Sequence, residues 1–318
     1  MTMLPSLRRA TLPRLLLTKQ VPINLSFSSQ KPSFTFFSTR KMNTLQEASR
    51  IYKALQKPGP TFGGWQMLPG TNLARSIARS GVDWICVDTE HGNISDSEMH
   101  EAVTAIALSG VSPLVRIASN EAWMVKRALD SGAHGIIVPL IYTVDDAKRL
   151  VSSAKFPPQG TRGFGSPLPT QCFGNEAMSY YLQHANSTLI TILQIETRPA
   201  LEHVREIAAL PGVDVLLIGP FDLGNNIGHP ILTGEIAPEL DAAIEAIKEA
   251  AHAEGKKVAI YCNSGEDAKR YAQRGFDMMS VLTDQIGITG AFQRSLGVAK
   301  GEVEGSGGDG KVKGYDGR

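Results

Sequence analysis

Two apolar segments that each end in a carboxylate place the strongest constraint on the fold of this chain. Residues 189–197 are apolar and β-branched up to Glu196, and residues 214–222 repeat the pattern and end at Asp222. Runs of this kind favour parallel strands that are covered on both faces. A helix-like segment, residues 199–210, joins them, so the three segments predict a βαβ unit. In such a unit the carboxyl ends of both strands lie at the same edge of the sheet.

Strand and helix patterns alternate in this way from residue 61 to residue 296. Strands are expected at residues 61–68, 83–88, 113–117, 135–141, 189–196, 213–218, 258–261 and 277–282, and helices at 72–80, 95–109, 121–131, 144–155, 199–210, 238–254, 265–274 and 286–296. Residues 157–187 are expected to be irregular, since they are rich in Gly, Pro and aromatic residues. Eight alternating units predict an α/β fold, a single-domain (β/α)8 TIM barrel over residues 47–300. A doubly wound open sheet is the alternative, although no G-x-G-x-x-G motif follows the first strand.

The two ends of the chain differ from this region. Residues 1–46 contain no Asp or Glu, but they carry seven Lys or Arg residues and many Ser and Thr. This composition is typical of a mitochondrial transit peptide and predicts a location in the mitochondrial matrix. A disordered basic tail is one alternative, and translation from Met42, which would give a cytoplasmic form, is another. Residues 301–318 are rich in Gly and are expected to form a disordered tail.

Composition argues against several classes of protein. The net charge of +1 gives no reason to expect nucleic acid or a membrane surface as a partner. No apolar run approaches the roughly 18 residues that a membrane-spanning helix needs. The three cysteines, Cys86, Cys172 and Cys262, are scattered and form no C-x-x-C pair, which favours a reduced compartment over a disulfide framework.

Glu196 and Asp222 form the first candidate site. Adjacent parallel strands are about 4.8 Å apart, so both carboxylates can reach one small cation. Gln194 lies two residues before Glu196 and points to the same side of its strand, and Trp65, near the end of the first strand, is expected to contact the substrate. Two carboxylates with no nearby Lys or Arg predict a hard divalent cation that keeps positions open for waters and substrate oxygens. The alternative is a pair of surface acids at the starts of two loops.

His91 is the histidine that follows a strand end, and histidine is the side chain best suited to move protons near neutral pH. Asp88, three residues earlier, is expected to orient the His91 ring. Arg116 ends the third strand and is expected to hold an oxyanion at the mouth of the barrel. The alternatives are a structural histidine and a salt bridge from Arg116 to Asp88 or Glu90, and such a salt bridge is compatible with the oxyanion role.

No lysine is expected at the carboxyl end of any strand, because Lys256 and Lys257 lie at the start of the seventh strand. A Schiff-base mechanism needs a desolvated lysine amine in the site. The sequence therefore favours stabilisation of an enolate by a metal ion over an imine mechanism.

Six motifs within residues 50–297 resemble those of a known family. They are 88–92 (DTEHG), 113–116 (PLVR), 135–139 (GIIVP), 156–163 (FPPQGTRG), 194–197 (QIET) and 219–223 (GPFDL). In this order they resemble the HpcH/HpaI aldolases, which are class II, metal-dependent pyruvate aldolases of the phosphoenolpyruvate/pyruvate barrel superfamily.

The resemblance implies a divalent cation, Mg²⁺, Mn²⁺ or Co²⁺, on Glu196 and Asp222. It also implies that His91 is the base with Asp88 as its dyad partner, and that Arg116 stabilises the transition state. The remaining implied residues contact the pyruvate unit or raise the basicity of the base: Gln194, the backbone amides of Phe221 and Asp222, and Asp130. The family typically assembles as a hexamer, a dimer of trimers, with the final helix swapped onto a neighbour.

Asp130 ends the helix expected at residues 121–131, where a carboxylate opposes the helix dipole at a cost of about 0.3–1 kcal/mol. The helices of a barrel run back towards its amino-terminal face, so Asp130 should lie far from His91 of its own chain. We therefore expect some other interaction to hold Asp130. The carboxylate could act on the base across a contact with a neighbouring subunit, which we favour, or through a chain of contacts along the barrel.

These observations predict a metal-dependent lyase that cleaves a 4-hydroxy-2-oxo acid to pyruvate and an aldehyde through a pyruvate enolate. Decarboxylation of oxaloacetate through the same enolate, as in macrophomate synthase, is one alternative. A non-catalytic oligomer that binds 2-oxo acids is another, and the retained base, arginine and metal ligands argue against it. Phe221 is bulky where relatives often carry a small residue, so the sequence does not identify the aldehyde product.

Overall fold

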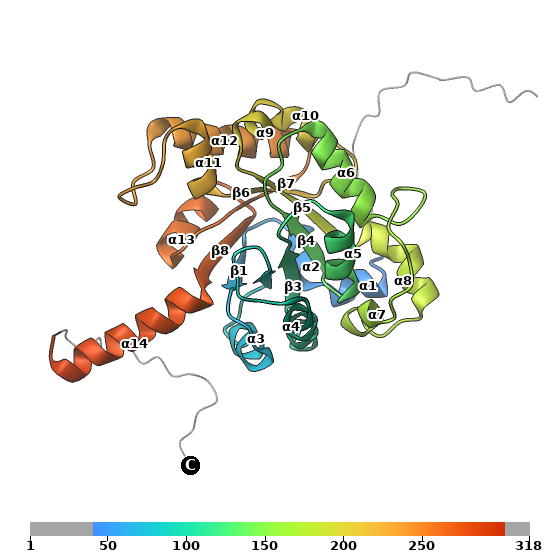
Figure 1. Ribbon diagram of the computed structural model, residues 1–318, viewed down its shortest axis with the longest axis horizontal. Helices are drawn as coiled ribbons and strands as arrows, with labels where there is room; N and C mark the ends of the chain where they lie inside the picture. Colours follow the sequence, from blue (N-terminus) through green and yellow to red (C-terminus); the bar gives the residue numbers. More distant parts are fainter. Residues whose placement is uncertain (1–40, 303–318) are drawn as a thin grey trace, which may run out of the picture. The chain divides into compact units, whose positions relative to one another are not determined.

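The computed structural model describes residues 41–302, and its eight strands form one closed parallel barrel (Figure 1). In chain order the strands are β1 (Thr61–Gln66), β2 (Trp84–Asp88), β3 (Ser112–Arg116), β4 (Gly135–Val138), β5 (Ile190–Ile195), β6 (Val215–Ile218), β7 (Lys257–Ile260) and β8 (Met278–Thr283). Each strand pairs with the next in the chain, and β8 pairs with β1 to close the barrel. The predicted (β/α)8 fold is confirmed.

Helices connect the strands and cover the outside of the barrel (Figure 1). They include α3 (Thr71–Ala78), α4 (Asp96–Leu108), α5 (Ala122–Asp130), α6 (Val144–Ala154), α11 (Pro220–Ile227), α12 (Pro238–Ala253) and α13 (Gly265–Gln273). The start of α4 follows from its sequence, because Ser95 and Glu98 form a capping box that satisfies two backbone N–H groups. Within residues 41–302, no helix is both long enough and apolar enough to cross a bilayer.

Two apolar layers hold the barrel together. Alternate strand residues such as Trp84, Leu114 and Ile192 fill its lumen, and residues such as Val87 and Leu216 lie between strands and helices. Side chains at successive strand positions point to opposite faces, and both faces of the strands are buried except near the end of β8, where Leu282 is exposed. Polar side chains are therefore confined to the two ends of the barrel, and this confinement positions the site.

Two short helices close the amino-terminal end of the barrel. They are α1 (Thr44–Ala48), which is capped by Asn43, and α2 (Arg50–Leu55), whose Ile51 joins the lumen cluster. The expected boundary between residues 46 and 47 falls inside α1. The predicted transit peptide up to residue 40 and the predicted tail from residue 303 lie outside the described residues.

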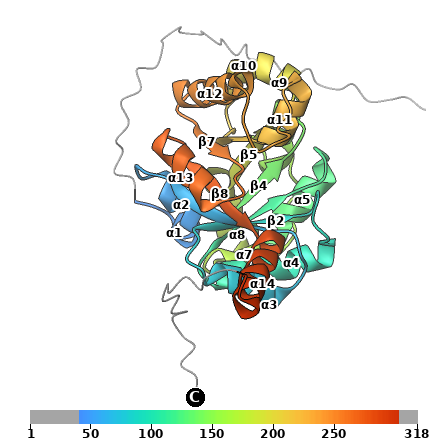
Figure 2. The ribbon, with the colours of Figure 1, turned by 90° about the vertical axis from the view of Figure 1, so that its left-hand side faces the viewer.

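Several segments differ from the sequence-based expectation, including α1, α2 and α11, which were not expected as helices. Residues 157–187 hold α7 (Leu168–Cys172), α8 (Met178–His184) and the 3-10 turn η1 (Ala185–Ser187), and the helix expected at 199–210 is split into α9 (Arg198–Glu202) and α10 (Val204–Ala208). The last helix, α14 (Asp284–Lys300), is longer than expected and projects away from the barrel in Figure 1; in Figure 2 it points towards the viewer.

Candidate active site

The predicted polar strand ends meet at a cavity of about 160 Å³ at the carboxyl-terminal end of the barrel. Its lining comprises Trp65, Met67, His91, Arg116, Gln194, Leu217, Gly219, Pro220, Phe221, Asp222 and Tyr261. Six of the residues predicted from the sequence therefore lie together: Trp65, His91, Arg116, Gln194, Phe221 and Asp222. None of the described residues that line this cavity is a lysine.

Arg116 is fixed by two carboxylates at the floor of the cavity. Its Nε and Nη2 donate to Asp88 at 2.9 and 2.5 Å, and its Nη1 lies 3.1 Å from Glu90 Oε2. Register explains the first pair, because Asp88 and Arg116 lie opposite each other on β2 and β3. The salt bridge considered as an alternative for Arg116 is present, and it holds the guanidinium in a fixed orientation beside the cavity.

Asp88 is fully buried and uses its two oxygens on several donors. Besides Arg116, it accepts from the indole N–H of Trp65 at 3.0 Å and from the backbone N–H groups of Glu90 and His91 at 3.1 and 3.3 Å. Burial raises the pKa of Asp88, but the hydrogen bonds and the charge of Arg116 outweigh it and hold the pKa below its usual value. Asp88 thus fixes both the loop that carries Glu90 and His91 and the guanidinium of Arg116.

The His91 ring does not lie against Asp88 as the sequence suggested. Its Nε2 lies 3.8 Å from Glu90 Oε1, and 60% of the side chain is exposed. Asp88 contacts only the backbone of His91, because its oxygens are occupied by Arg116 and Trp65. Glu90, which the sequence offered only as a salt-bridge partner, is therefore the carboxylate nearest the imidazole. The sequence feature that could have indicated this role for Glu90 is its position inside the DTEHG motif.

The pKa of Glu90 is raised to about 7, chiefly by burial; the charge of Arg116 opposes the rise, and the charges of Asp88 and Asp222 add to it. The tight turn that carries Glu90 and His91 depends on Gly92. A Cβ there would lie 2.2 Å from the carbonyl oxygen of Asp88, so no side chain fits.

Glu196 is buried beside the end of β5. One oxygen accepts from the backbone N–H of Leu140 at 2.8 Å, and the other accepts from Gln194 Nε2 at 2.5 Å. Leu140 itself has a φ of 50°, a strained conformation for a leucine, which aims its N–H at the carboxylate. Burial raises the pKa of Glu196 to about 7, and the charges of Asp222 and Glu90 contribute to the rise.

Asp222 stands in the first turn of α11 and lines the same cavity as Arg116. Arg116 pairs with Asp88 and Glu90, and among the described residues no Lys or Arg forms an ion pair with Asp222 or Glu196. Two further observations concern the space around Glu196. Gln194 Oε1 is buried without a hydrogen-bond partner, and a Cβ on Gly219 would lie 2.4 Å from Glu196 Oε2.

Three aromatic rings form one side of the cavity. The Arg116 guanidinium lies 4.9 Å from the Trp65 ring centroid, Tyr261 meets Trp65 edge-on at 5.0 Å, and Phe221 lies 6.5 Å from Tyr261. The sequence analysis missed Tyr261, which follows β7 directly and was assigned to the strand itself. Burial raises the pKa of Tyr261 to about 12, so it stays protonated as a hydroxyl donor.

Asp130 lies apart from this cavity at the end of α5. Its carboxylate is held within its own chain, because Arg162 Nη2 donates to it at 2.8 Å. Arg162 is in turn fully buried, with its guanidinium 4.5 Å from the Phe156 ring centroid. The interaction expected to hold Asp130 is therefore this internal ion pair, which compensates for the unfavourable helix dipole.

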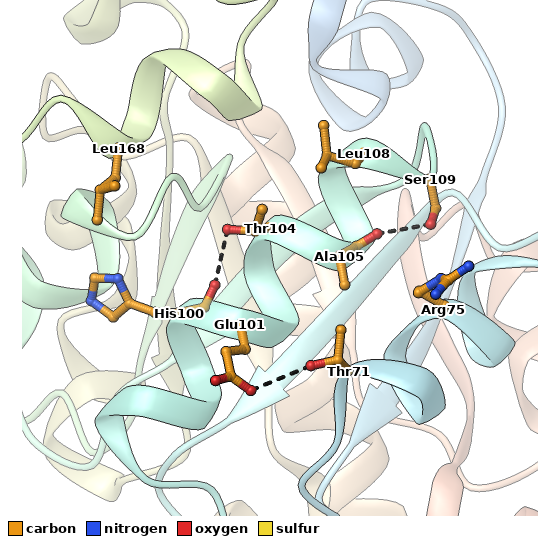
Figure 3. Close-up of a pocket in the computed structure, with 9 residues that line it drawn as sticks. All are labelled: Thr71, Arg75, His100, Glu101, Thr104, Ala105, Leu108, Ser109 and Leu168. Atoms are coloured by element: carbon orange, nitrogen blue, oxygen red, sulfur yellow. Dashed lines mark hydrogen bonds between the residues drawn. The ribbon is translucent and has the colours of Figure 1, made fainter.

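A larger cavity, of about 720 Å³, lies on the outer surface between α3 and α4 (Figure 3). Thr71 and Arg75 line it from α3, and His100 and Glu101 line it from α4. It shares no residue with the strand-end cavity, and in Figure 3 Thr71 donates a hydrogen bond to Glu101 while His100 and Arg75 lie apart from that pair. We therefore place the candidate active site at the strand ends.

An imidazole, a guanidinium and two buried carboxylates around a strand-end cavity define an enzyme of the (β/α)8 class with an acid–base and anion-stabilising site. The family model for HpcH/HpaI aldolase/citrate lyase matches residues 62–289, and the chain belongs to this family. It is accordingly a carbon–carbon lyase.

Individual relatives agree with this assignment. A hydroxypyruvate/pyruvate aldolase of Rhizorhabdus wittichii is 35% identical over 241 residues, which cover 76% of this chain and 94% of the relative. The crystal structure of an HpcH/HpaI aldolase/citrate lyase family protein from Burkholderia cenocepacia matches with a TM-score of 0.73 at 32% identity, covering 79% of this chain and 99% of that one. Macrophomate synthase shares the fold with a TM-score of 0.70 at 24% identity, covering 81% and 91%.

Proposed function

We propose that this protein is a divalent-metal-dependent aldolase that cleaves 4-hydroxy-2-oxo acids to pyruvate and an aldehyde through a pyruvate enolate. The observation that carries the proposal is the buried Glu196. Its carboxylate is repelled by the charge of Asp222 and forms no ion pair among the described residues, and Arg116 is held in a fixed orientation at the same end of the barrel. The name of the relative, hydroxypyruvate/pyruvate aldolase, supports a 2-oxo acid as the substrate class.

The residues around Glu196 fit a hard divalent cation such as Mg²⁺, Mn²⁺ or Co²⁺. Gln194 Oε1 is a buried oxygen without a partner, and the charge of Asp222 contributes to the raised pKa of Glu196, so positive charge between the two carboxylates would be stabilising. Glu196 and Asp222 would hold the ion, and Gly219 leaves Glu196 Oε2 unobstructed. Within residues 41–302 no three His, Cys, Asp or Glu side chains are arranged as a metal site, so water and substrate oxygens would complete the coordination. A bound divalent cation supplies Lewis-acid stabilisation of the negative charge on the 2-oxo group.

The chain's own residues supply the rest of the chemistry. Arg116, held by Asp88 and Glu90, presents a positive charge to the enolate oxygen as it develops, without reorganising. His91 stands at the rim, where it can remove the proton of the 4-hydroxyl group, and Glu90 lies close enough to stabilise the resulting imidazolium. Breaking the C3–C4 bond then releases the aldehyde and leaves the electron pair on the pyruvate unit.

The test is pyruvate release from a panel of 4-hydroxy-2-oxo acids and from oxaloacetate, measured with and without a chelator. We expect cleavage of the hydroxy-oxo acids to stop on chelation and to return with Mg²⁺, Mn²⁺ or Co²⁺, and borohydride with pyruvate to trap no adduct. Faster turnover of oxaloacetate than of every hydroxy-oxo acid would favour the decarboxylase instead. A stable reduced pyruvate adduct on the protein would contradict the metal mechanism.

We further propose a homohexamer, a dimer of trimers, in which α14 packs on a neighbouring subunit. The helix exposes Ile286, Ile288, Phe292 and Leu296, and contiguous apolar surface of this kind marks an interface. An apolar cavity of about 580 Å³ lies between the start of α14 and α3. Light scattering should give six chains for the protein and a smaller species for Phe292→Glu. A monomer at micromolar concentration would contradict the proposal.

The proposed role of Asp130 is linked to this assembly. If Asp130 acts on His91 of a neighbouring subunit, Asp130→Asn and the smaller Phe292→Glu species should both lower activity and move the acidic limb of the pH–rate profile downward. An unchanged profile in Asp130→Asn would exclude the role.

Mitochondrial import also remains a proposal. A fusion of residues 1–41 to a fluorescent protein should enter mitochondria, and a fusion that stays in the cytosol would contradict it.

A further inference from the structure

A second cavity, of about 380 Å³, adjoins the candidate active site. The two cavities share Pro220, Phe221 and Tyr261, so these residues form a common wall between them. The catalytic cavity, at about 160 Å³, is smaller than the ~300–1,000 Å³ of most small-molecule sites. A substrate longer than its pyruvate unit must therefore extend beyond it, and the adjoining cavity lies directly past Phe221 and Tyr261.

Two buried polar groups in the second cavity have no hydrogen-bond partner. The Tyr271 hydroxyl is one, on a side chain that is 2% exposed, and Asn263 Oδ1 is the other. Buried polar groups in folded proteins are nearly always hydrogen-bonded, so an unpartnered pair in one cavity points to a ligand. The pair offers that ligand one hydroxyl and one carbonyl oxygen.

The charged groups of the second cavity cancel each other. Arg270 Nη2 lies 2.9 Å from Asp267 Oδ1, and Asp267 also accepts from the Ser264 hydroxyl at 2.8 Å. The paired charges give an anionic tail no net attraction, and a purely apolar tail would leave Tyr271 and Asn263 unpartnered. Hydroxyl groups both donate and accept, so they match this lining. Ile231 and Ile236 supply apolar walls for the carbon chain.

We propose that this cavity binds a hydroxylated tail on the aldehyde half of the substrate, a subsite that rests on the aldolase function proposed above. Asn263 accepts from one hydroxyl of the tail, and Tyr271 exchanges a hydrogen bond with another. The two residues are specificity-determining contacts that touch neither the pyruvate unit nor the reacting bond. The enzyme should accordingly prefer a hydroxyaldehyde to an alkyl aldehyde of the same length.

The experiment compares condensation of pyruvate with glyceraldehyde and with propanal, which share a three-carbon chain and differ in two hydroxyl groups. The Mn²⁺-loaded full-length protein is compared with Tyr271→Phe, which keeps the ring and loses the hydroxyl, and with Asn263→Leu. Tyr52→Phe is the matched control, because its hydroxyl binds Gln46 at the amino-terminal end of the barrel. Exchange of the C3 protons of pyruvate with D₂O, followed by NMR, reports the pyruvate half of the reaction separately.

The wild-type kcat/KM should be higher for glyceraldehyde than for propanal. Tyr271→Phe and Asn263→Leu should each reduce that ratio by about 3- to 10-fold, which corresponds to the usual net contribution of one hydrogen bond. Both variants should keep the wild-type rate of proton exchange, and Tyr52→Phe should keep the wild-type ratio. Intact proton exchange with an unchanged aldehyde ratio would overturn the subsite alone. Absence of proton exchange in the wild-type protein would overturn the proposed aldolase function, and the subsite with it.

Discussion

At the amino-terminal end of the barrel, Asp277 accepts hydrogen bonds from Lys257 at 2.8 Å, from the His252 ring at 2.9 Å and from the backbone N–H of Val258 at 3.0 Å. Burial raises its pKa, but these partners outweigh burial and hold the pKa below its usual value. At the carboxyl-terminal end, Glu196 has neutral donors only, and its pKa is raised to about 7. The partners of Asp277 thus outweigh the cost of burying its charge, whereas the partners of Glu196 do not.

The histidines of the two ends differ in the same way. His134 is buried, and its ring bonds to Ser112 Oγ at 2.9 Å and to the carbonyl oxygen of Cys172 at 3.0 Å. Ser112 Oγ accepts from the backbone N–H of Ile51, so its own proton is free for His134 Nδ1. His91 is mostly exposed beside Glu90. His134 therefore has a complete set of partners that fixes it in the fold, whereas His91 is left accessible to a ligand in the cavity.

Replacing the two histidines should give the largest and most contrasting effects. His91→Ala should lower the rate of aldol cleavage by about 10²–10⁴, because the base is lost, with little change in the unfolding midpoint. Decarboxylation of oxaloacetate should fall much less, since it removes no hydroxyl proton. His134→Ala should do the reverse, lowering stability while the folded fraction keeps its kcat. Equal losses of both reactions in His91→Ala would contradict its role as base.

The pH dependence of stability should show the effect of the buried His134 ring. Burial lowers its pKa to about 4, from an ordinary value near 6.5 in the unfolded chain. Between those values the unfolded state binds a proton that the folded state excludes, so stability falls as pH decreases through this window. The contribution of His134 to this change should reach about 3 kcal/mol, measured as the difference between the wild-type protein and His134→Asn in denaturant unfolding at pH 7 and at pH 4.

His203→Gln is the control for that measurement, because His203 is half exposed on the outer surface. It should leave the acid slope of stability unchanged, whereas His134→Asn should flatten it. Equal slopes in all three proteins would show that His134 does not carry the effect.

Glu196→Gln should stabilise the metal-free protein while it removes activity. The folded-state pKa of Glu196 is about 7, above the unfolded value of about 4.5, so charging the group costs stability as pH rises from 4.5 to 7. At pH 8 the substitution should therefore add up to about 3 kcal/mol to the free energy of unfolding, and at pH 4 almost nothing.

Asp277→Asn, at the amino-terminal end of the barrel, should change the free energy of unfolding in the opposite direction. Its carboxylate is paired with Lys257, so its loss should destabilise the protein at pH 8. A destabilising Glu196→Gln in the metal-free protein would remove the contrast between the two ends.

The sequence predicted the barrel because strand and helix periodicities are local and repeat eight times. It also predicted the cavity residues at the ends of β3 and β5 and those that follow β6 in α11, since the carboxyl ends of parallel strands meet at one edge. It assigned Asp88 to the His91 ring wrongly, because sequence spacing does not reveal that Arg116 and Trp65 occupy both carboxylate oxygens. The pairing of Asp130 with Arg162, 32 residues later, likewise depends on long-range packing that no local pattern encodes.

The most direct test of the central claim is calorimetric titration of Mn²⁺ into the metal-free protein at pH 8. We predict one ion per chain for the wild-type protein and for Asp277→Asn, and loss of binding in both Glu196→Gln and Asp222→Asn. Because Glu196 must lose its proton to bind the ion, the wild-type affinity should also fall as pH decreases below about 7. Unchanged Mn²⁺ binding in Glu196→Gln and Asp222→Asn would contradict the account.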